Sequence, residues 1–291
     1  MPYLIATILL HVLIFIAFRS FSQYKMNTFQ AVVSNYLVCV VTGSLLISNG
    51  GGQAFSGVSL STDWLPLAGL LGAMFVSTFY LMAMATQRLG MGIASIASQM
   101  SLIIPVMFSL FIFQINTERF TALNYAGIAL ALVAIFLATM QKGGNASRAG
   151  GLTLVLMPIS IFFMNGLITT FINYINLNFL SQAEEALFPI FAFGAAAIIG
   201  SVVIAVSRQR ISLKSILGGI YLGIPNYFSI YFLLRALSAF DNNGAFLYPI
   251  FNIGVILGSS LAGLLLYRER LGRTNLLGLL LAIIALAMLA F

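Results

Sequence analysis

The sequence predicts an all-α membrane protein with ten transmembrane helices in two inverted five-helix repeats. Composition is the first observation: 61% of the 291 residues are hydrophobic and 7% are charged, whereas a soluble domain carries roughly 25% charged residues. The second is a series of ten apolar runs of about 20 residues, the length at which a helix crosses the hydrocarbon core. The third is an internal repeat that relates the two halves of the chain.

The ten runs are separated by segments rich in glycine, asparagine and basic residues, such as "QKGGNASRAGG". They cover residues 2–18, 28–48, 64–86, 91–114, 120–140, 151–175, 183–206, 216–237, 243–266 and 273–291. The first run has no basic start, carries His11 at its middle and is followed by "RSFSQYK", which lacks the small residues of a signal-peptide cleavage site. We therefore expect it to be a retained helix.

A shift of 151 positions superimposes the second half of the chain on the first, and it places Glu118 and Arg119 on Glu269 and Arg270. It also matches Tyr80 with Tyr231, Ala85 with Ala236, Ala94 with Ala245, Ser109 with Ser260, Leu110 with Leu261, Asn124 with Asn275, Gly127 with Gly278, Leu130 with Leu281, Ala131 with Ala282 and Ala134 with Ala285. Upstream, "GSLLI" at Gly43 agrees with "GSVVI" at Gly200 once the connecting loops are allowed to differ in length. These identities indicate one unit that is used twice.

The two repeats are predicted to occupy residues 1–141 and 151–291. Because each contains an odd number of helices, the second must enter the membrane from the opposite side, which produces an inverted repeat. Inverted halves enclose a cavity near the bilayer midplane, and two packings of one half against the other give alternating access to that cavity.

Basic residues lie mainly in one set of loops. The loops after the first, third, fifth, seventh and ninth runs carry Arg19, Lys25, Arg88, Lys142, Arg148, Arg208, Arg210, Lys214, Arg268, Arg270 and Arg273. The opposite loops carry Arg119, with Arg235 near that membrane edge. The positive-inside rule therefore places the basic loops in the cytoplasm and both termini outside. Single basic residues between apolar runs, rather than a basic patch, argue against nucleic-acid binding despite the net charge of +7.

A proline-bearing helix, a Glu-Arg turn and a small-residue helix close each half. The segment "PVMFSLFIFQINTERFTALNYAGIALALVAIFLA" begins at Pro105, and "PIFNIGVILGSSLAGLLLYRERLGRTNLLGLLLAIIALAMLAF" begins at Pro249. This pattern resembles the EamA-type families of the drug/metabolite transporter superfamily. The second half departs from the first, because Pro249 lies twenty residues before Glu269 and Ile256 stands at the place equivalent to Pro105. The resemblance implies a secondary transporter or exporter of small metabolites, with no particular substrate.

The Glu-Arg pairs and the small residues that follow them have structural readings. We expect the pairs to fix the turns rather than to contact substrate, since an acidic residue at the start of a helix favours its dipole by ~0.3–1 kcal/mol. Gly127 with Ala131, and Gly278 with Ala282, form small-residue faces that let helices approach closely. They predict tight packing inside each half or a dimer contact.

The few polar groups inside the runs are the candidate substrate-binding residues, because polar side chains in a membrane are costly and often functional. We select His11, Tyr80, Gln99, Asn165, Asn226, Tyr227, Tyr231, Tyr248 and Asn252. Amides and phenols with aromatic walls suit a neutral or zwitterionic metabolite with an apolar part. The alternative is hydrogen bonding between helices, worth ~0.6 kcal/mol on average in membranes. His11 could bind a proton during transport, or it could be a neutral histidine bonded to a neighbouring helix.

Nothing in the sequence indicates an enzyme, a metal site or a cofactor, since one histidine and six carboxylates leave few groups for such chemistry. The first run also lacks the carboxylate of the small multidrug resistance proteins, which argues against a cation-for-proton exchanger of their type. We expect an exporter of small neutral or zwitterionic metabolites such as amino acids in the bacterial inner membrane. Its partners are a small-molecule substrate and the lipid bilayer, and it is a monomer, with a dimer as the alternative. A lipid head-group flippase and a proton-coupled drug efflux protein remain the alternative functions.

Overall fold

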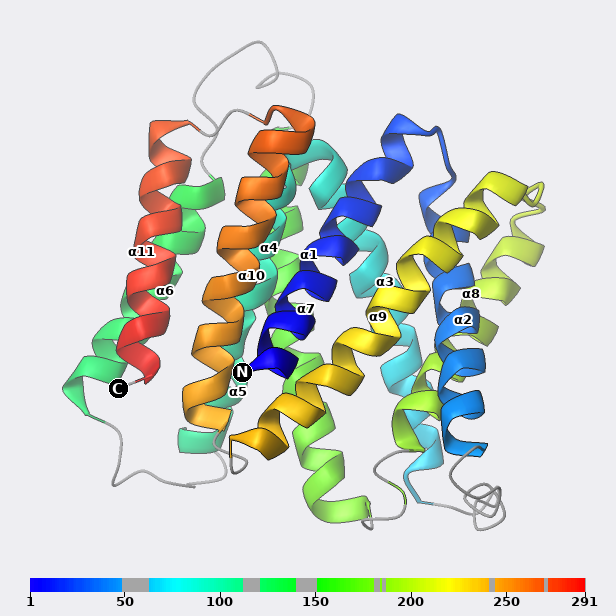
Figure 1. The fold of residues 1–291 in the computed structure, drawn as a ribbon, viewed down its shortest axis with the longest axis horizontal. Coiled ribbons are helices and arrows are strands. Elements are labelled where there is room, and N and C mark those ends of the chain that lie inside the picture. Colours follow the sequence, from blue (N-terminus) through cyan, green and yellow to red (C-terminus); the bar gives the residue numbers. More distant parts are fainter. Residues whose placement is uncertain are drawn as a thin grey trace. The chain divides into compact units, whose positions relative to one another are not determined.

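A computed structural model of the chain describes residues 1–48, 63–111, 121–139, 151–180, 184, 187–240, 244–269 and 272–290. Within these residues the chain is all-helical (Figure 1). The α-helices are α1 (Pro2–Gln23), α2 (Thr28–Ser48), α3 (Leu65–Leu89), α4 (Met91–Gln99), α5 (Ile103–Phe111), α6 (Ala122–Thr139), α7 (Gly151–Phe179), α8 (Phe188–Val206), α9 (Leu213–Ala239), α10 (Gly244–Tyr267) and α11 (Arg273–Ala290).

Each of the ten predicted runs contains helix, and nine of them form one continuous helix. The fourth run is the exception, because a short 3₁₀ turn (Met100–Leu102) separates α4 from α5. Among the residues that the structure describes, seven helices are long and apolar enough to cross a membrane, and three further apolar segments are shorter. The coarse prediction of a helical membrane protein is therefore confirmed, and the count of ten crossings stays a prediction.

Large apolar side chains cover much of the helix surface. Ile198 and Leu265 are each 67% exposed, and Phe136 is 62% exposed. A soluble monomer rarely exposes contiguous apolar surface on this scale, whereas lipid tails solvate such side chains without cost. The exposed faces therefore fit a hydrocarbon environment.

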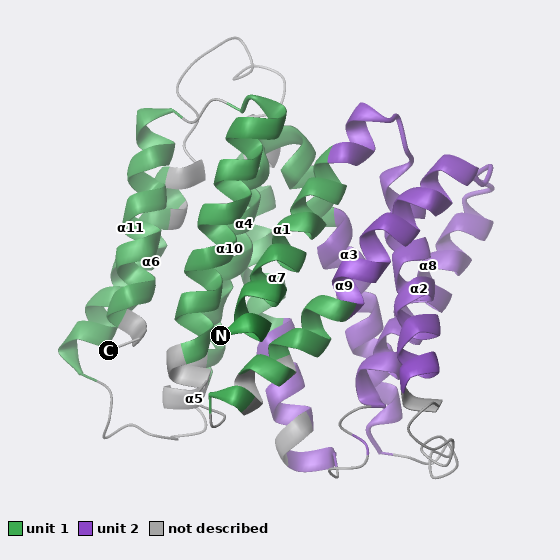
Figure 2. Cartoon of the chain, in the orientation of Figure 1, with its two compact units in different colours: residues 1–19, 81–167, 228–291 green, residues 20–80, 168–227 purple. Residues whose placement is uncertain are grey.

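The chain divides into two compact units, and each unit takes segments from both halves of the sequence (Figure 2). Unit 1 contains Met1–Arg19, Leu81–Leu167 and Phe228–Phe291, and unit 2 contains Ser20–Tyr80 and Ile168–Tyr227. The 151-residue shift carries the boundary after Tyr80 to Tyr231, close to the observed boundary after Tyr227. The units thus divide the two halves at nearly equivalent positions, while the repeat limits of 1–141 and 151–291 stay a prediction.

The most extensive helix contacts join helices that the repeat makes equivalent: α6 with α11 and α4 with α10 in unit 1, and α2 with α8 in unit 2. The α2–α8 contact is reciprocal. A Cβ added at Gly43 would lie 3.0 Å from Cγ1 of Ile190, and one added at Gly200 would lie 2.4 Å from Cγ2 of Val33. The end of each helix thus meets the beginning of the other, so α2 and α8 are antiparallel.

The α6–α11 contact uses the predicted small-residue faces. Ala131, Ala134, Ala282 and Ala285 are fully buried in the apolar core of unit 1, and Figure 1 shows the two helices side by side. The packing therefore joins helices from the two sequence halves. The prediction of packing inside each half differs from this arrangement, because the small faces of the two repeats pack against each other.

Equivalent asparagines cap these two helices. Oδ1 of Asn124 accepts a hydrogen bond from the Thr121 backbone N–H at 2.9 Å, and Oδ1 of Asn275 accepts one from the Gly272 N–H at 3.1 Å. Each bond satisfies an N–H that the first turn leaves unpaired. The repeated asparagines therefore have a local structural reason. Glu118, Arg119 and Arg270 of the Glu-Arg turns lie outside the described residues.

Candidate functional site

The fourth predicted run contains a 3₁₀ turn, and among the described residues it is the most irregular helical segment of unit 1. Regular helix ends at Gln99, the 3₁₀ turn follows, and α5 begins at Ile103. Pro105 lies in the first turn of α5, where a missing N–H is tolerated, but it cannot donate to the carbonyl of Ser101. Immediately before this proline the structure has a 3₁₀ turn in place of α-helix, while the backbone stays in the right-handed helical region at Gln99, Met100 and Ile103.

Side-chain amides from two other helices bond to carbonyls at this turn. Nδ2 of Asn252 on α10 donates to the Gln99 carbonyl at 3.3 Å. Nδ2 of Asn165 on α7 donates to Oγ of Ser98 at 2.8 Å and to its carbonyl at 3.3 Å. The Ser101 hydroxyl donates to the same Ser98 carbonyl at 2.5 Å. Backbone groups freed from a helix inside hydrocarbon need such partners.

The polar side chains around the 3₁₀ turn are buried. Gln99 is 8% exposed, Asn252 and Ser101 are 5% exposed, and Ser98 is 4% exposed. We call this set, together with Asn165, the polar seam. It unites three predicted site residues, Gln99, Asn165 and Asn252, in one place, and its bonds also fit the alternative of hydrogen bonding between helices.

His11 lies on α1 beside the same helix α10. Its ring meets the ring of Phe251 edge-on, with 4.7 Å between centroids. Nδ1 lies 3.1 Å from the Thr7 carbonyl one turn earlier on α1 and donates to it when it carries the hydrogen. His11 therefore contacts the residue next to Asn252, and its role in proton binding stays a prediction.

The other predicted site residues in unit 1 do not join the polar seam through a described contact. The hydroxyl of Tyr231 on α9 accepts a hydrogen bond from Arg235 at 3.2 Å, and the guanidinium of Arg235 lies 5.5 Å from the centre of the Tyr231 ring. Tyr248 is half-buried on α10. Tyr231 thus lies in an aromatic and basic setting near the end of α9.

The remaining predicted residues belong to unit 2, and Asn226 has a packing role there. Its Nδ2 donates to Oδ1 of Asn35 at 3.1 Å, and it lies 3.6 Å from the Cys39 sulfur. The ring of Tyr227 lies against Gly43, where a Cβ would approach Cε2 to 2.9 Å. Tyr80 meets Phe29 edge-on at 5.5 Å. Asn35 is not among the candidate residues predicted from the sequence, although its polar side chain inside an apolar run was a signal that could have identified it.

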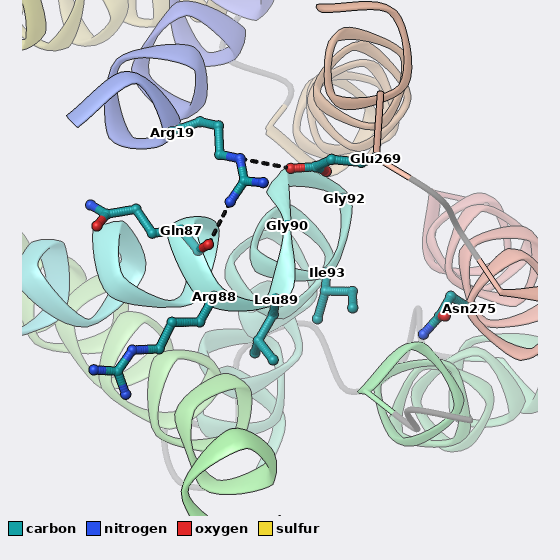
Figure 3. A pocket seen from close by; sticks show the side chains of 9 residues that line it. All are labelled: Arg19, Gln87, Arg88, Leu89, Gly90, Gly92, Ile93, Glu269 and Asn275. Carbon is teal, nitrogen blue, oxygen red and sulfur yellow. Dashed lines mark hydrogen bonds and ion pairs between the residues drawn. The ribbon is translucent and has the colours of Figure 1, made fainter. Parts of the chain in front are cut away.

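A second polar site occupies the ends of α1, α3 and α10 in unit 1. A cavity of about 230 Å³ is lined by Arg19, Gln87, Arg88, Leu89, Gly90, Gly92, Ile93, Glu269 and Asn275 (Figure 3). Nε of Arg19 lies 3.3 Å from Oε1 of Glu269. The Arg19 guanidinium also donates to the carbonyl of Gln87 near the end of α3. We call this site the end cavity.

The backbone brings Glu269 back over the start of α4. Arg268 has a φ of 52°, which turns the chain at the end of α10, and the Glu269 N–H then bonds to the Gly263 carbonyl at 3.0 Å. Oε2 of Glu269 accepts the Met91 N–H at 2.9 Å. A Cβ at Gly90 or at Gly263 would approach that oxygen to 2.8 or 2.5 Å. Two glycines thus make room for this carboxylate at the start of a helix.

Opposing effects act on the charge of Glu269. Burial raises the pKa of Glu269 above its ordinary value, while the Met91 N–H and the Arg19 guanidinium act to lower it. The Arg19 side chain is 25% exposed and that of Glu269 is 12% exposed, so the pair is partly open to water. From the sequence, Glu269 is expected to form a turn, and Arg19, which lies 250 residues away in the chain, is not among the candidate site residues.

Comparisons with known proteins bear on the fold. No family model matches the chain. A protein of Haemophilus influenzae described as uncharacterized is 26% identical over 264 residues, which are 88% of this chain and 86% of that protein. A crystal structure resembles this chain with a TM-score of 0.61, covering 99% of this chain and 94% of the other at 14% identity. At that identity the likeness shows a shared fold.

Proposed function

We propose that the protein is a secondary transporter that exports small neutral or zwitterionic metabolites, such as amino acids, across the bacterial inner membrane by alternating access. The observation that carries this proposal is the polar seam at the 3₁₀ turn of the fourth predicted run. Transporters place broken helices where backbone carbonyls can meet a substrate, and such backbone is tolerated in a membrane only inside protein or beside a cavity. The seam offers carbonyls, hydroxyls and amides together, which suits a ligand without net charge.

The contacts between equivalent helices support the inverted repeat on which alternating access depends. Reciprocal contacts such as Gly43 with Ile190 and Gly200 with Val33 are those of a two-fold relation. Because α2 and α8 are antiparallel, the axis of that relation lies across the helices. For helices that cross a membrane, such an axis lies in the membrane plane, as in inverted-repeat transporters.

The distribution of charge supports the proposed orientation. In unit 1, Arg19, Arg88 and Glu269 line the end cavity, which lies at the ends of α1, α3 and α10. These are ends that the positive-inside rule assigns to the cytoplasm. Arg235 lies on α9 beside Tyr231, in a region that the same rule assigns to the outside.

Counterflow in proteoliposomes tests the function. Vesicles loaded with a pool of unlabelled amino acids should accumulate the corresponding radiolabelled amino acids from outside, one member of the pool at a time. Asn252→Ala should weaken the apparent affinity by about tenfold, since a buried amide contact is worth on the order of 1 kcal/mol. Asn178→Ala, an exposed amide on α7 that bonds to the Tyr174 carbonyl, provides the matched control.

The outcomes separate the candidate functions. Accumulation of a labelled amino acid that depends on Asn252 supports the proposal. Movement of a fluorescent phospholipid between leaflets without any amino-acid counterflow would instead favour the flippase. Uptake of a cationic dye that requires a pH gradient, again without counterflow, would favour drug efflux.

A further inference from the structure

The end cavity combines opposite charges with an apolar wall. Arg19 and Glu269 face each other across 3.3 Å, and Figure 3 shows their side chains pointing toward one another while Arg88 points away from the pair. Leu89 and Ile93 supply apolar lining. A volume of about 230 Å³ lies below the ~300–1,000 Å³ typical of sites for drug-sized ligands. The cavity therefore suits a ligand of amino-acid size.

One oxygen of Glu269 has bonding capacity to spare. Oε2 is held by the Met91 N–H, whereas Oε1 is buried and accepts no hydrogen bond from the residues that the structure describes. Its only described partner is the Arg19 guanidinium, through the ion pair. A buried carboxylate oxygen in this state gains strongly from a hydrogen-bond donor, above all a cationic one.

We propose that the end cavity is a loading site for small α-amino acids, in which Glu269 binds the ammonium group and Arg19 binds the carboxylate of the ligand. The ligand exchanges one internal ion pair for two pairs of its own, so no charge is left alone. Its side chain lies against Leu89 and Ile93. This inference rests on the proposed function for its biological sense, because an exporter takes up substrate from the side on which this cavity is predicted to lie.

Occupancy would also loosen a junction between helices. Arg19 links α1 to the end of α3 through the Gln87 carbonyl, and Glu269 links the end of α10 to the start of α4 through the Met91 N–H. The ion pair joins these two links. A ligand that separates Arg19 from Glu269 removes the direct connection and can therefore favour a rearrangement of these helix ends.

Ligand-observed NMR of the purified protein tests the site without knowledge of the transported substrate. The probes are glycine, L-alanine, L-valine and L-leucine, each compared with its N-acetyl derivative and its methyl ester. We expect at least one free amino acid to bind, and we expect its N-acetyl derivative and methyl ester to bind at least about tenfold more weakly, because each lacks one of the two charges. Equal binding of the N-acetyl derivative would overturn the role of Glu269, and absence of binding by all four amino acids would overturn the site.

Variants then assign the site. Glu269→Gln and Arg19→Gln should each weaken binding at least about tenfold, whereas Glu184→Gln, which removes a carboxylate that accepts the Trp64 indole N–H, should not change it. Undiminished binding in both Glu269→Gln and Arg19→Gln would place the ligand elsewhere. Should either variant fail to fold, the comparison of derivatives on the unaltered protein still decides.

The pH dependence gives an independent readout. The guanidinium of Arg19 on α1 faces Glu269, and α4 contributes the Met91 backbone N–H. Arg88 on α3 and Asn275 on α11 also line the cavity, and Arg88 points away from the pair (Figure 3). Glu269 is the carboxylate of this set, and burial raises its pKa above its ordinary value. Amino-acid binding should therefore weaken as the pH falls and Glu269 takes up a proton, and Glu269→Gln should remove that dependence.

Failure of the site and failure of the proposed function give different results. Counterflow without any dependence of binding on Glu269 or Arg19 would remove the loading site and leave transport standing. Binding that depends on both residues, in a protein without counterflow, would leave the site and remove transport.

Discussion

Two pairs of equivalent helices in unit 1 pack in contrasting ways. The α6–α11 pair consists of two continuous helices whose buried contact is made by alanines of zero exposure. The α4–α10 pair contains the 3₁₀ turn, has Pro249 inside α10 and carries the bond from Asn252 to the Gln99 carbonyl. One pair therefore relies on close apolar contact, and the other on directional bonds around an irregular backbone.

The contrast indicates that equivalent helices can form either a rigid contact or a contact that can rearrange. Close-packed small residues leave few alternative arrangements, because any shift produces overlap or a void. A helix that already lacks some of its own hydrogen bonds bends at lower cost. The α6–α11 pair is thus suited to a fixed part of the protein, and the α4–α10 pair to a part that rearranges.

The largest expected effect is loss of stability when the α6–α11 contact is overfilled. Ala282→Leu adds three carbon atoms at a position with zero exposure and should cost about 1–3 kcal/mol, seen as a lower midpoint of thermal unfolding in detergent. Leu280→Ala, at a position that is 51% exposed, is the control and should have little effect. An unchanged midpoint in Ala282→Leu would show that this contact is loose and would break the comparison.

A smaller change in stability, this time an increase, is expected when Pro105 beside the 3₁₀ turn is replaced. Pro105→Ala restores an N–H that can bond to the Ser101 carbonyl, so stability should rise by on the order of 1 kcal/mol, while the rate of counterflow falls. Pro158→Ala, in the uninterrupted α7, serves as the control. If counterflow in Pro105→Ala is as fast as in the unaltered protein, then the 3₁₀ turn is not needed for movement.

Substitution of His11, which contacts Phe251 next to Asn252 of the polar seam, tests whether the His11 imidazole binds the coupling proton. His11→Gln should leave the unfolding midpoint nearly unchanged, since a half-buried edge-on ring contact is worth about 0.5–1.5 kcal/mol at most. It should abolish the dependence of uptake on a pH gradient and retain exchange of substrate. Gradient dependence that persists in this variant would make His11 a packing residue of α1 and α10.

The smallest stability effects are expected at tyrosines outside both helix pairs. The repeat makes Tyr80 and Tyr231 equivalent, and each is a predicted substrate-binding residue. Tyr80→Phe and Tyr231→Phe each remove one hydroxyl and should change stability by less than about 1 kcal/mol while weakening substrate affinity. Unaltered affinity in both variants would confine binding to the polar seam.

The sequence predicted the helices well because each depends on a local property. A run of about 20 apolar residues must form helix in a membrane, since only helix pairs its backbone groups internally, and every predicted run contains helix in the described residues. Three candidate residues, Gln99, Asn165 and Asn252, lie together as polar groups in a membrane are expected to. The partner of Glu269 was not predictable, because nothing in the sequence near that turn indicates contact with Arg19.

By itself, then, the sequence determined the helical membrane class and the small-residue faces, which follow from hydrophobic periodicity, and it predicted the repeat from identities at a fixed offset. Only the tertiary structure decided which faces meet: α6 against α11 across the two halves, the amides of α7 and α10 on the carbonyls of the fourth predicted run, and Arg19 on Glu269. The physical reason is that contact partners depend on how helices pack in three dimensions, where residues 250 positions apart can lie 3.3 Å apart. The local sequence determines where each helix forms, and tertiary packing determines which helices it contacts.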